Sequence, residues 1–385
     1  MTTASPQHQA SRKLYWIALT LTTGLGATRC RNLVTHFGGV ENVFHAGLTD
    51  LEGAGLAAPS AQAIANGKSL AAAEEEMIRA TSIGAEIVTL DDEAYPPQLN
   101  EIYDPPPSLH VRGDVSVLTE PGIAMVGTRH PTPYGLGMAE RLACDLGARG
   151  LIIFSGMARG IDTAAHRGCL AGKGKTVAVF GTGVDVIYPR ENEKLAGQII
   201  AQGGALVSEF AVGSFAAPQN FPIRNRIISG LAAGVLVVEA GEYSGTRITS
   251  RCALEQNREL FAVPGNVTNR NSWTPNTLIK QGAKLTATWE DVWEELPPAI
   301  RSRLAPANAA TAEAPPSLFD AAANMSPHEK RIFGMLRADE AVHIDQIVEK
   351  LEQQISSSEI FAALFELELA GKIRQLPGKN YVRVF

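Results

Sequence analysis

Short apolar runs alternate with helical stretches through the middle of the chain. The runs are "AEIVTL", "GIAMVG", "LIIFSG", "TVAVFG", "ALVSEF", "GVLVVEA" and "ELFAVPG", which lie between residues 85 and 265. Continuous apolar strands separated by amphipathic helices are typical of a parallel sheet that is covered on both faces. The pattern therefore predicts a Rossmann-like α/β domain over residues 81–296, with a doubly wound and mostly parallel sheet.

Residues 1–80 show apolar positions at helical intervals, with glycines where helices would turn. This pattern predicts a small helical domain of the helix-hairpin-helix or SAM-like kind. Glycine turns of this type can offer backbone N–H groups to a DNA phosphate, but they also occur in helical modules that bind nothing. Because few basic residues lie here beyond Arg29 and Arg31, both interpretations remain open.

The chain ends in a second small domain. Residues 297–324 are rich in alanine and proline, which predicts a linker. Over residues 325–385, three helical stretches and two strands joined by a Pro-Gly turn predict a winged helix, and Ser326 with Glu329 forms a capping-box pattern. The third helix carries Glu359, Glu366 and Glu368 but no lysine or arginine, which favours a protein partner over DNA at this helix.

Charge is distributed unevenly along the 385 residues. The whole chain has a formal net charge of -6, which argues against indiscriminate binding of nucleic acid. Residues 121–290, however, carry 17 lysines and arginines against 12 acidic residues, a net +5, and the remainder carries net -11. This distribution would focus an anionic ligand on the central domain. Four widely spaced cysteines without a CxxC predict neither a zinc site nor disulfides and fit a reducing cytosol.

Small residues and arginines follow four of the predicted strands. The segments are "GTRH" after Val126, "SGMARG" after Phe154, "GTG" after Phe180 and "EAGEYSGTR" after Val238. The arginines are Arg129, Arg159 and Arg247. Since the carboxyl ends of parallel strands meet at one edge, and glycine lets a ligand approach the backbone at a helix start, we expect a phosphate there. The alternative is that the glycines only close tight turns.

The stretch "PQNFPIRNRIISGL" adds an aromatic ring to this basic edge. Pro222 predicts an extended Phe221, and Arg224 and Arg226 flank Asn225 before an apolar helix. This arrangement suits a base stacked beside a sugar-phosphate backbone. Phe221 could instead belong to the core, and either arginine could pair with Glu209 or Glu239. Arg190 and Lys175 add positive charge near other strand ends.

Dinucleotide binding and catalysis find little support in the sequence. "GLGMAE" and "GTGVDV" lack the third glycine of a dinucleotide fingerprint, so NAD is not expected. Asp162 is expected to cap a helix, and His166 has no cysteine or serine neighbour that would suggest a nucleophile. We therefore expect no catalytic residue, no metal and no cofactor.

Seven strings taken together resemble the DNA-processing protein A family, also called DprA or Smf. They are "GTRHPTPYG", "SGMARGIDTAAH", "GKTVAVFGTGVDVIYPREN", "LVSEF", "NFPIRNRIISGL", "SGTRIT" and "NTLIKQGAKL". The resemblance implies a cytoplasmic bacterial protein, homodimeric and not an enzyme. Such a protein would bind single-stranded DNA, shield it from nucleases and help load the RecA recombinase during natural transformation.

Residue by residue, the resemblance assigns DNA contact to the matching motif positions. These are Arg129, Ser155, Gly156, Gly160, Lys175, Arg190, Phe221, Arg224, Asn225, Arg226, Ser244, Gly245 and Thr246. Some members place a lysine shortly before the Phe-Pro pair, where this chain has Pro218, Gln219 and Asn220. The strength of binding at that edge is therefore open.

Two other functions remain as alternatives. "EAGEYSGTRIT" distantly resembles the "PGGxGT" loop of lysine-decarboxylase-like nucleoside-monophosphate phosphoribohydrolases. Those enzymes follow the loop with catalytic glutamates, whereas here Arg247, Ile248 and Thr249 occupy the segment and Glu255 is the next acid. The other alternative is an adaptor that mainly holds protein partners through the winged helix and a dimer face.

Overall fold

A nine-stranded sheet forms the centre of the molecule. The computed structural model describes residues 6–304, 325–338, 340–352 and 354–384. The strand order is β1-β2-β6-β5-β4-β3-β7-β8-β9, with parallel pairing from β6 to β9 and antiparallel pairing of β2 with β1 and β6. The strands are β1 (Glu86–Thr89), β2 (Ser108–Gly113), β3 (Gly122–Val126), β4 (Ile152–Ser155), β5 (Thr176–Val179), β6 (Ala205–Ser208), β7 (Gly234–Val237), β8 (Glu259–Ala262) and β9 (Lys284–Leu285). The predicted Rossmann-like, mostly parallel sheet is confirmed.

The strand order contains one reversal. From β3 the chain moves outward through β4, β5 and β6, then returns to the other side of β3 and moves outward through β7, β8 and β9. In open α/β sheets the loops on the two sides of such a reversal diverge, and ligands bind beyond the carboxyl ends of the strands there. The topology therefore places the expected binding cleft between the loops that follow β3 and β7.

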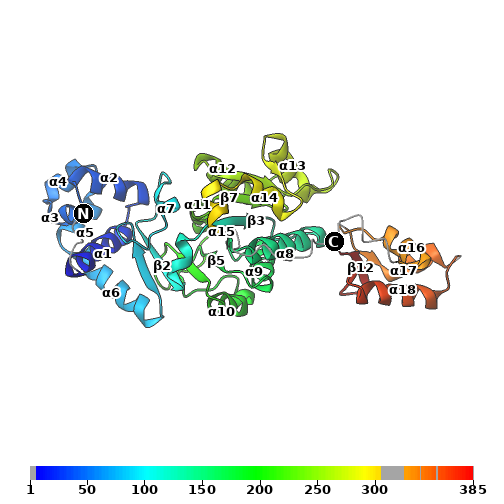
Figure 1. Cartoon of the computed structure of the whole chain (residues 1–385). Helices are drawn as coiled ribbons and strands as arrows, with labels where there is room; N and C mark the ends of the chain where they lie inside the picture. The colour runs from blue at the N-terminus through cyan, green and yellow to red at the C-terminus, as the bar shows by residue number, and fades with distance from the viewer. Residues whose placement is uncertain (1–5, 305–324, 339, 353, 385) are drawn as a thin grey trace.

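Helices cover both faces of the sheet (Figure 1). Ile123 and Met125 of β3 pack with α8, α9 and α14 on one face, whereas Ala124 and Val126 pack with α7, α11, α12 and α13 on the other. This alternation follows from the two-residue period of a strand. The helices are α7 (Pro97–Asn100), α8 (Pro133–Ala148), α9 (Ile161–Ala171), α10 (Glu193–Ala201), α11 (Asn220–Leu231), α12 (Thr246–Glu255), α13 (Trp273–Lys280) and α14 (Trp289–Glu295), with 3₁₀ turns η1 (Val115–Thr119), η2 (Arg190–Asn192) and η3 (Arg270–Ser272).

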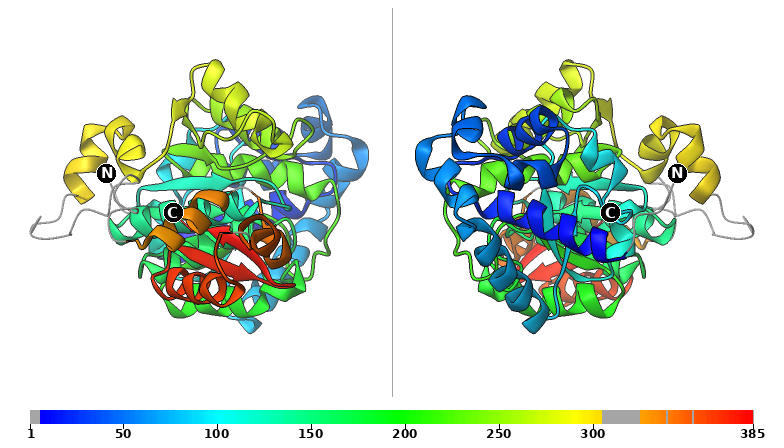
Figure 2. Two further views of the ribbon diagram at one scale, coloured as in Figure 1. Left: turned by 90° about the vertical axis from the view of Figure 1, so that its right-hand side faces the viewer. Right: turned by 90° about the vertical axis from the view of Figure 1, so that its left-hand side faces the viewer.

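Six helices precede the sheet and have a core of their own. They are α1 (Pro6–Leu21), α2 (Ala27–Phe37), α3 (Val40–His45), α4 (Leu48–Gly53), α5 (Ala58–Ala65) and α6 (Lys68–Ser82). Side chains such as Trp16, Leu33 and Leu51 are buried among them. The group docks against the β1–β2 edge of the sheet (Figure 2), where the indole of Trp16 donates a 2.6 Å hydrogen bond to Asp91.

The C-terminal residues form the predicted winged helix. Its elements are α16 (Pro327–Met335), β10 (Val342–His343), α17 (Ile344–Leu351), α18 (Ser357–Leu369), β11 (Ile373–Leu376) and β12 (Asn380–Arg383). Both hydrogen bonds of the capping box between Ser326 and Glu329 are present at the start of α16. Gly378 at the hairpin turn has a φ of 80°, a left-handed conformation that glycine adopts at little cost.

The linker prediction needs correction at its start. Residues Pro298–Leu304 form helix α15, and Ile300 and Leu304 pack against the core cluster below α8 and α14. Arg303 also pairs with Glu120 at 2.6 Å. The alanine and proline of this stretch resemble the linker that follows, so its amphipathic pattern was not recognised in the sequence. Residues 305–324 lie outside the part that the structure describes. Within the described residues, no helix combines the length and the apolar character needed to cross a membrane.

Candidate nucleic-acid interface

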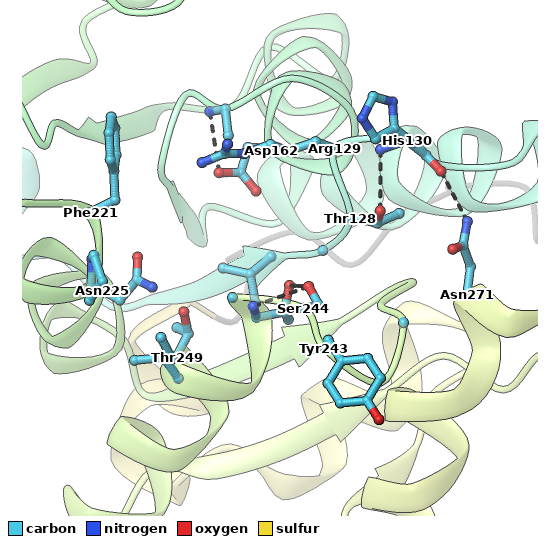
Figure 3. A pocket seen from close by; sticks show the side chains of 18 of the residues that line it. Thr128, Arg129, His130, Asp162, Phe221, Asn225, Tyr243, Ser244, Thr249 and Asn271 are labelled. Carbon is cyan, nitrogen blue, oxygen red and sulfur yellow. Dashed lines mark hydrogen bonds between the residues drawn. The ribbon is translucent and has the colours of Figure 1, made fainter. Parts of the chain in front are cut away.

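A pocket of about 960 Å³ opens at the reversal of strand order (Figure 3). Its walls come from the loops after β3, β4, β5 and β7, the start of α11, and the start of α13 with the turn before it. The lining includes Thr128, Arg129, His130, Asp162, Tyr188, Phe221, Arg224, Asn225, Glu242, Tyr243, Ser244, Gly245, Thr246, Arg270 and Trp273. The volume lies at the upper end of the range of about 300–1,000 Å³ that small-ligand sites occupy.

The loop between β3 and α8 is fixed by a carboxylate at the end of β7. Glu239 is 1% exposed and accepts hydrogen bonds from the backbone N–H (2.9 Å) and hydroxyl (2.6 Å) of Thr132. Its carbonyl oxygen accepts the N–H of Thr128 at 2.6 Å. Gly135 faces the same carboxylate so closely that a Cβ atom would clash with it. These contacts hold the two loops of the reversal together and leave Arg129 exposed above them.

Arg129 is the basic residue of this loop that faces the pocket. Its guanidinium carbon lies 5.9 Å from the centroid of the Phe221 ring. Tyr188 approaches the same ring with a centroid separation of 5.6 Å and an interplanar angle of 43°. A cation over an aromatic face and a neighbouring tilted ring provide the charge and flat surface that a stacked nucleotide uses.

The start of α11 differs from its predicted conformation. Phe221 and Pro222 already belong to the helix, so Pro222 does not hold Phe221 extended. Proline is tolerated in a first helical turn because the N–H groups there have no intrahelical partner. The side-chain amide of Asn220 donates to the carbonyl of Gly181 at 3.1 Å, and the Phe221 ring lies over that glycine. Phe221 is therefore half-buried, with its position set by the loop after β5.

The glycines of "SGMARG" lie against other parts of the protein itself, where no Cβ atom would fit. A Cβ atom on Gly156 would clash with the guanidinium of Arg224, and one on Gly160 would clash with the carbonyl of Thr128. The N–H groups of Gly156 (3.2 Å) and Ala158 (3.3 Å) donate to the carboxylate of Asp162. The anion against this backbone is thus Asp162, which corrects the expectation that a bound phosphate occupies it.

Asp162 and Arg224 form a buried charged pair beneath the pocket. Arg224 is 5% exposed and donates to the carbonyl oxygens of Gly156 (2.7 Å) and Val179. Burial raises the pKa of Asp162 from 3.8 to about 6, and Arg224 partly opposes this shift. Burial also lowers the pKa of Arg224 to about 10, which the charge of Asp162 partly opposes. Both side chains line the pocket, and their hydrogen bonds to the backbone of Gly156, Ala158 and Val179 hold this part of its wall in place.

Several residues assigned from the sequence lie away from the pocket. Arg226 is 8% exposed and pairs with Glu209 (2.7 Å) and Asp104 (2.9 Å), so the alternative of an ion pair with Glu209 is the correct one. These two carboxylates raise the pKa of Arg226 against the effect of burial. Lys175 precedes β5, at the amino end of the strand, and pairs with Asp114 at 3.2 Å. Arg226 therefore lies outside the pocket, beside Glu209 at the carboxyl end of β6, and Lys175 lies at the opposite edge of the sheet.

The remaining assigned residues of this region are placed around the rim or inside the fold. The hydroxyl of Ser155 is buried and donates to the carbonyl of Met125 at 2.6 Å. Arg159 pairs with Glu191 at 2.8 Å on the surface. Arg190 is exposed in η2, two residues beyond Tyr188. Of the positions that the strand-end motifs and the resemblance assign to binding, the pocket brings together Arg129, Phe221, Arg224, Asn225, Ser244, Gly245 and Thr246.

The β7–α12 loop forms the opposite side of the pocket. The hydroxyl of Ser244 accepts the N–H of Thr246 at 3.2 Å and donates to its hydroxyl at 2.9 Å. Gly245 gives α12 no side-chain cap, and the N–H groups of Arg247 and Ile248 donate to the carbonyls of Ser244 and Gly245, so the first turn offers the hydroxyls of this loop to the cavity. The helix dipole favours an anion at this position.

Several pocket residues were not predicted from the sequence. His130, Tyr188, Tyr243, Arg270 and Trp273 line the cavity, and although the first three lie inside quoted strings, none of the five was assigned a role. Tyr243 lies inside the quoted "EAGEYSGTR", and its position two residues after a strand-end glycine was an available signal. Trp273 comes from the start of α13, and no local pattern places that helix beside β7.

The winged helix presents a surface of different chemistry. Phe361, Phe365 and Leu369 are 52%, 64% and 74% exposed on successive turns of α18. Glu366 and Glu368 lie exposed among them. An acidic, apolar helix face repels phosphate and suits a protein surface. Protein binding at this helix stays a prediction.

Comparison with known proteins agrees with these features. A family model described as DNA recombination-mediator protein A matches residues 86–297, and one described as the DprA winged helix domain matches residues 306–379. Protein Smf of Escherichia coli strain K12 is 42% identical over 305 residues, which cover 77% of this chain and 77% of that protein. DNA processing protein DprA of Bacillus subtilis is 43% identical over 215 residues, covering 56% of this chain and 72% of that protein.

A solved structure extends the agreement to three dimensions. The X-ray structure of DNA processing protein A from Streptococcus pneumoniae superposes with a TM-score of 0.64 at 33% identity. The match covers 74% of this chain and 98% of that chain. With a family model over more than half of its length and a relative 42% identical over most of it, this chain belongs to the DNA recombination-mediator protein A family, DprA/Smf.

Proposed function

We propose that the pocket binds single-stranded DNA without chemical conversion. The observation that carries this proposal is the juxtaposition of two surfaces at the reversal of strand order. One is the aromatic and basic wall of Arg129, Phe221 and Tyr188. The other is the start of α12, with the hydroxyls of Ser244 and Thr246. Bases would stack on the first surface, and a phosphate would accept hydrogen bonds from the second.

The wider role follows from family membership. We propose that the protein shields incoming single strands in the cytoplasm during natural transformation and helps load RecA on them. The family description as a recombination mediator and the DNA-processing names of the relatives support this role. A homodimer is supported by strand β9, which ends the sheet and leaves Leu285 47% exposed. Light scattering of the purified chain measures this state.

The proposal is tested by fluorescence anisotropy with labelled oligothymidylate and a duplex of equal length at two salt concentrations. We expect the single strand to bind more tightly and its affinity to fall steeply as salt increases, because phosphate neutralisation releases counterions. Salt-independent affinity would contradict phosphate contact. Release of free base from AMP in the same preparation would favour the phosphoribohydrolase alternative, in which a carboxylate such as Glu242 at the pocket would act.

Acidification is expected to strengthen DNA binding. The pKa of Asp162 is raised to about 6, so this carboxyl group takes up a proton in the folded protein as the pH falls from 7.5 to 5.5. Loss of one negative charge beneath the pocket favours a bound phosphate, and we expect a gain of roughly fivefold, or about 1 kcal/mol. Anisotropy titrations at both pH values measure it.

Two variants test the contribution of Asp162 to this pH dependence. His130 is another titratable side chain that lines the pocket, and it provides the comparison. His130→Gln should keep most of the pH dependence, whereas Asp162→Asn, once its melting curve shows a folded protein, should flatten it. A wild-type affinity that is unchanged or lower at pH 5.5 would rule out a contribution from Asp162.

A further inference from the structure

Two aromatic side chains on the far wall of the pocket have no role in the binding mode described so far. Tyr243 in the β7–α12 loop is 92% exposed, and Trp273 at the first residue of α13 is 40% exposed. Both line the same cavity as Phe221. Phe221 lies over Gly181 beyond β5, whereas Trp273 follows a segment bonded to the end of β7, so the two rings stand on opposite sides of the reversal.

The backbone on both sides of Trp273 is firmly held. The N–H of Ala240 donates to the carbonyl of Asn271 at 2.7 Å, and the N–H of Thr274 donates to the carbonyl of Ala240 at 3.0 Å. The hydroxyl of Thr274 donates to Gly241 at 2.8 Å. The side chain of Asn271 donates to the carbonyl of His130 at 2.9 Å, which ties α13 to the β3–α8 loop (Figure 3). The backbone that carries Trp273 is therefore held at the cavity, and its side chain stays partly exposed to water.

An arginine lies beside the Trp273 ring, as Arg129 lies beside the Phe221 ring. The carbon of the Arg247 guanidinium lies 5.6 Å from the Trp273 centroid, and the same side chain donates to the carbonyl of Glu242 at 3.0 Å. Arg270, three residues before Trp273, also lines the cavity. The pocket thus contains two aromatic surfaces, each with an arginine beside it, and the polar loop of Ser244 and Thr246 between them.

We propose that Tyr243 and Trp273 form a second base-stacking surface, which takes a further nucleotide of the strand whose first base stacks on Phe221. This inference rests on the proposed single-strand binding and adds to it a second stacking subsite for the same strand. A flat, charged aromatic wall accepts any base, because every base has a π face. The cavity of about 960 Å³ has room for more than the single base that Phe221 alone would hold.

Tryptophan fluorescence tests this proposal directly. A base stacked on an indole quenches its emission, so oligothymidylate should quench wild-type protein, and Trp273→Phe should lose most of this quenching while anisotropy still reports binding. Trp289→Phe is the matched control, since Trp289 contacts Arg149 (3.3 Å to the ring centroid) and Trp293 away from the pocket. This control should retain the quenching.

Oligonucleotide length provides the second readout. Trp273→Ala with Tyr243→Ala should weaken binding of a 12-nucleotide oligothymidylate by about 5- to 100-fold, as expected for one or more lost stacking contacts, and should change binding of a trinucleotide far less. Binding of the 12-mer with wild-type affinity and undiminished quenching in Trp273→Phe would overturn the inference and leave single-strand binding standing. Absence of any oligonucleotide binding by wild-type protein would overturn both.

Discussion

Replacing Arg224 by alanine is expected to lower the free energy of unfolding by about 3–5 kcal/mol, the usual cost of leaving a buried charge uncompensated. Arg224 is 5% exposed, and its charge interacts electrostatically with that of Asp162, which is 6% exposed. Without the guanidinium, the carboxylate keeps only the N–H groups of Gly156 and Ala158, and the carbonyls of Gly156 and Val179 lose a charged donor. Urea unfolding followed by circular dichroism measures the change.

Arg190→Ala is the matched control for this variant. Arg190 is an exposed arginine near the same edge, and a surface substitution of this kind should change the free energy of unfolding by no more than about 0.5 kcal/mol. Equal stability of the two variants would show that Arg224 is not the buried partner described here. Arg224 and Arg226 are both buried, so replacing the two together would unfold the domain. A loss of DNA binding in that double variant would therefore not report on direct contact with DNA.

The second large effect is expected at Arg129 and Phe221, which face the pocket. Loss of base stacking at Phe221→Ala should weaken single-strand affinity by about 1–3 kcal/mol. Arg129→Ala should lower affinity and reduce the slope of log affinity against log salt by about one, as for a single phosphate contact. Together the two changes should approach a 100-fold or greater loss at moderate salt, measured by anisotropy with labelled oligothymidylate.

Lys175→Ala supplies the comparison. Lys175 is a half-exposed cation of the same domain, but it lies at the amino end of β5 beside Asp114. We expect its replacement to leave affinity within about twofold, since a partly exposed ion pair far from the ligand contributes little. If Lys175→Ala weakened binding as much as Arg129→Ala, the strand would follow a different surface from the carboxyl edge.

The sequence predicted the central sheet well because buried parallel strands appear in it as continuous apolar runs. Seven apolar runs became β1 and β3 to β8, since strands covered on both faces need apolar residues at every position. The runs "SLHVRG" and "KL" gave no such signal, and they form β2 and β9 near the two edges. The antiparallel pairing of β2 with β1 and β6 depends on long-range contacts, which no local pattern contains.

The sequence indicated where in the fold the pocket lies, but it did not indicate which side chains are free to face it. Strand-end loops with glycine and arginine correctly indicated the edge where the pocket lies. A sequence does not distinguish a glycine that faces a ligand from one that faces the protein's own side chain, and Gly156 faces Arg224. It also does not distinguish a free arginine from a paired one, as Arg226 shows. The aromatic wall of Tyr243 and Trp273 required the fold, because α13 meets β7 only through tertiary contacts.

The location of the bound strand is measured most directly by photo-cross-linking the full chain to oligothymidylate that carries 5-iodouracil, followed by mass spectrometry. The pocket between the loops after β3 and β7 is expected to yield cross-linked peptides that contain Tyr188, Phe221 or Tyr243. Cross-links confined to α2, to α18 or to the amino edge around Lys175 would contradict it.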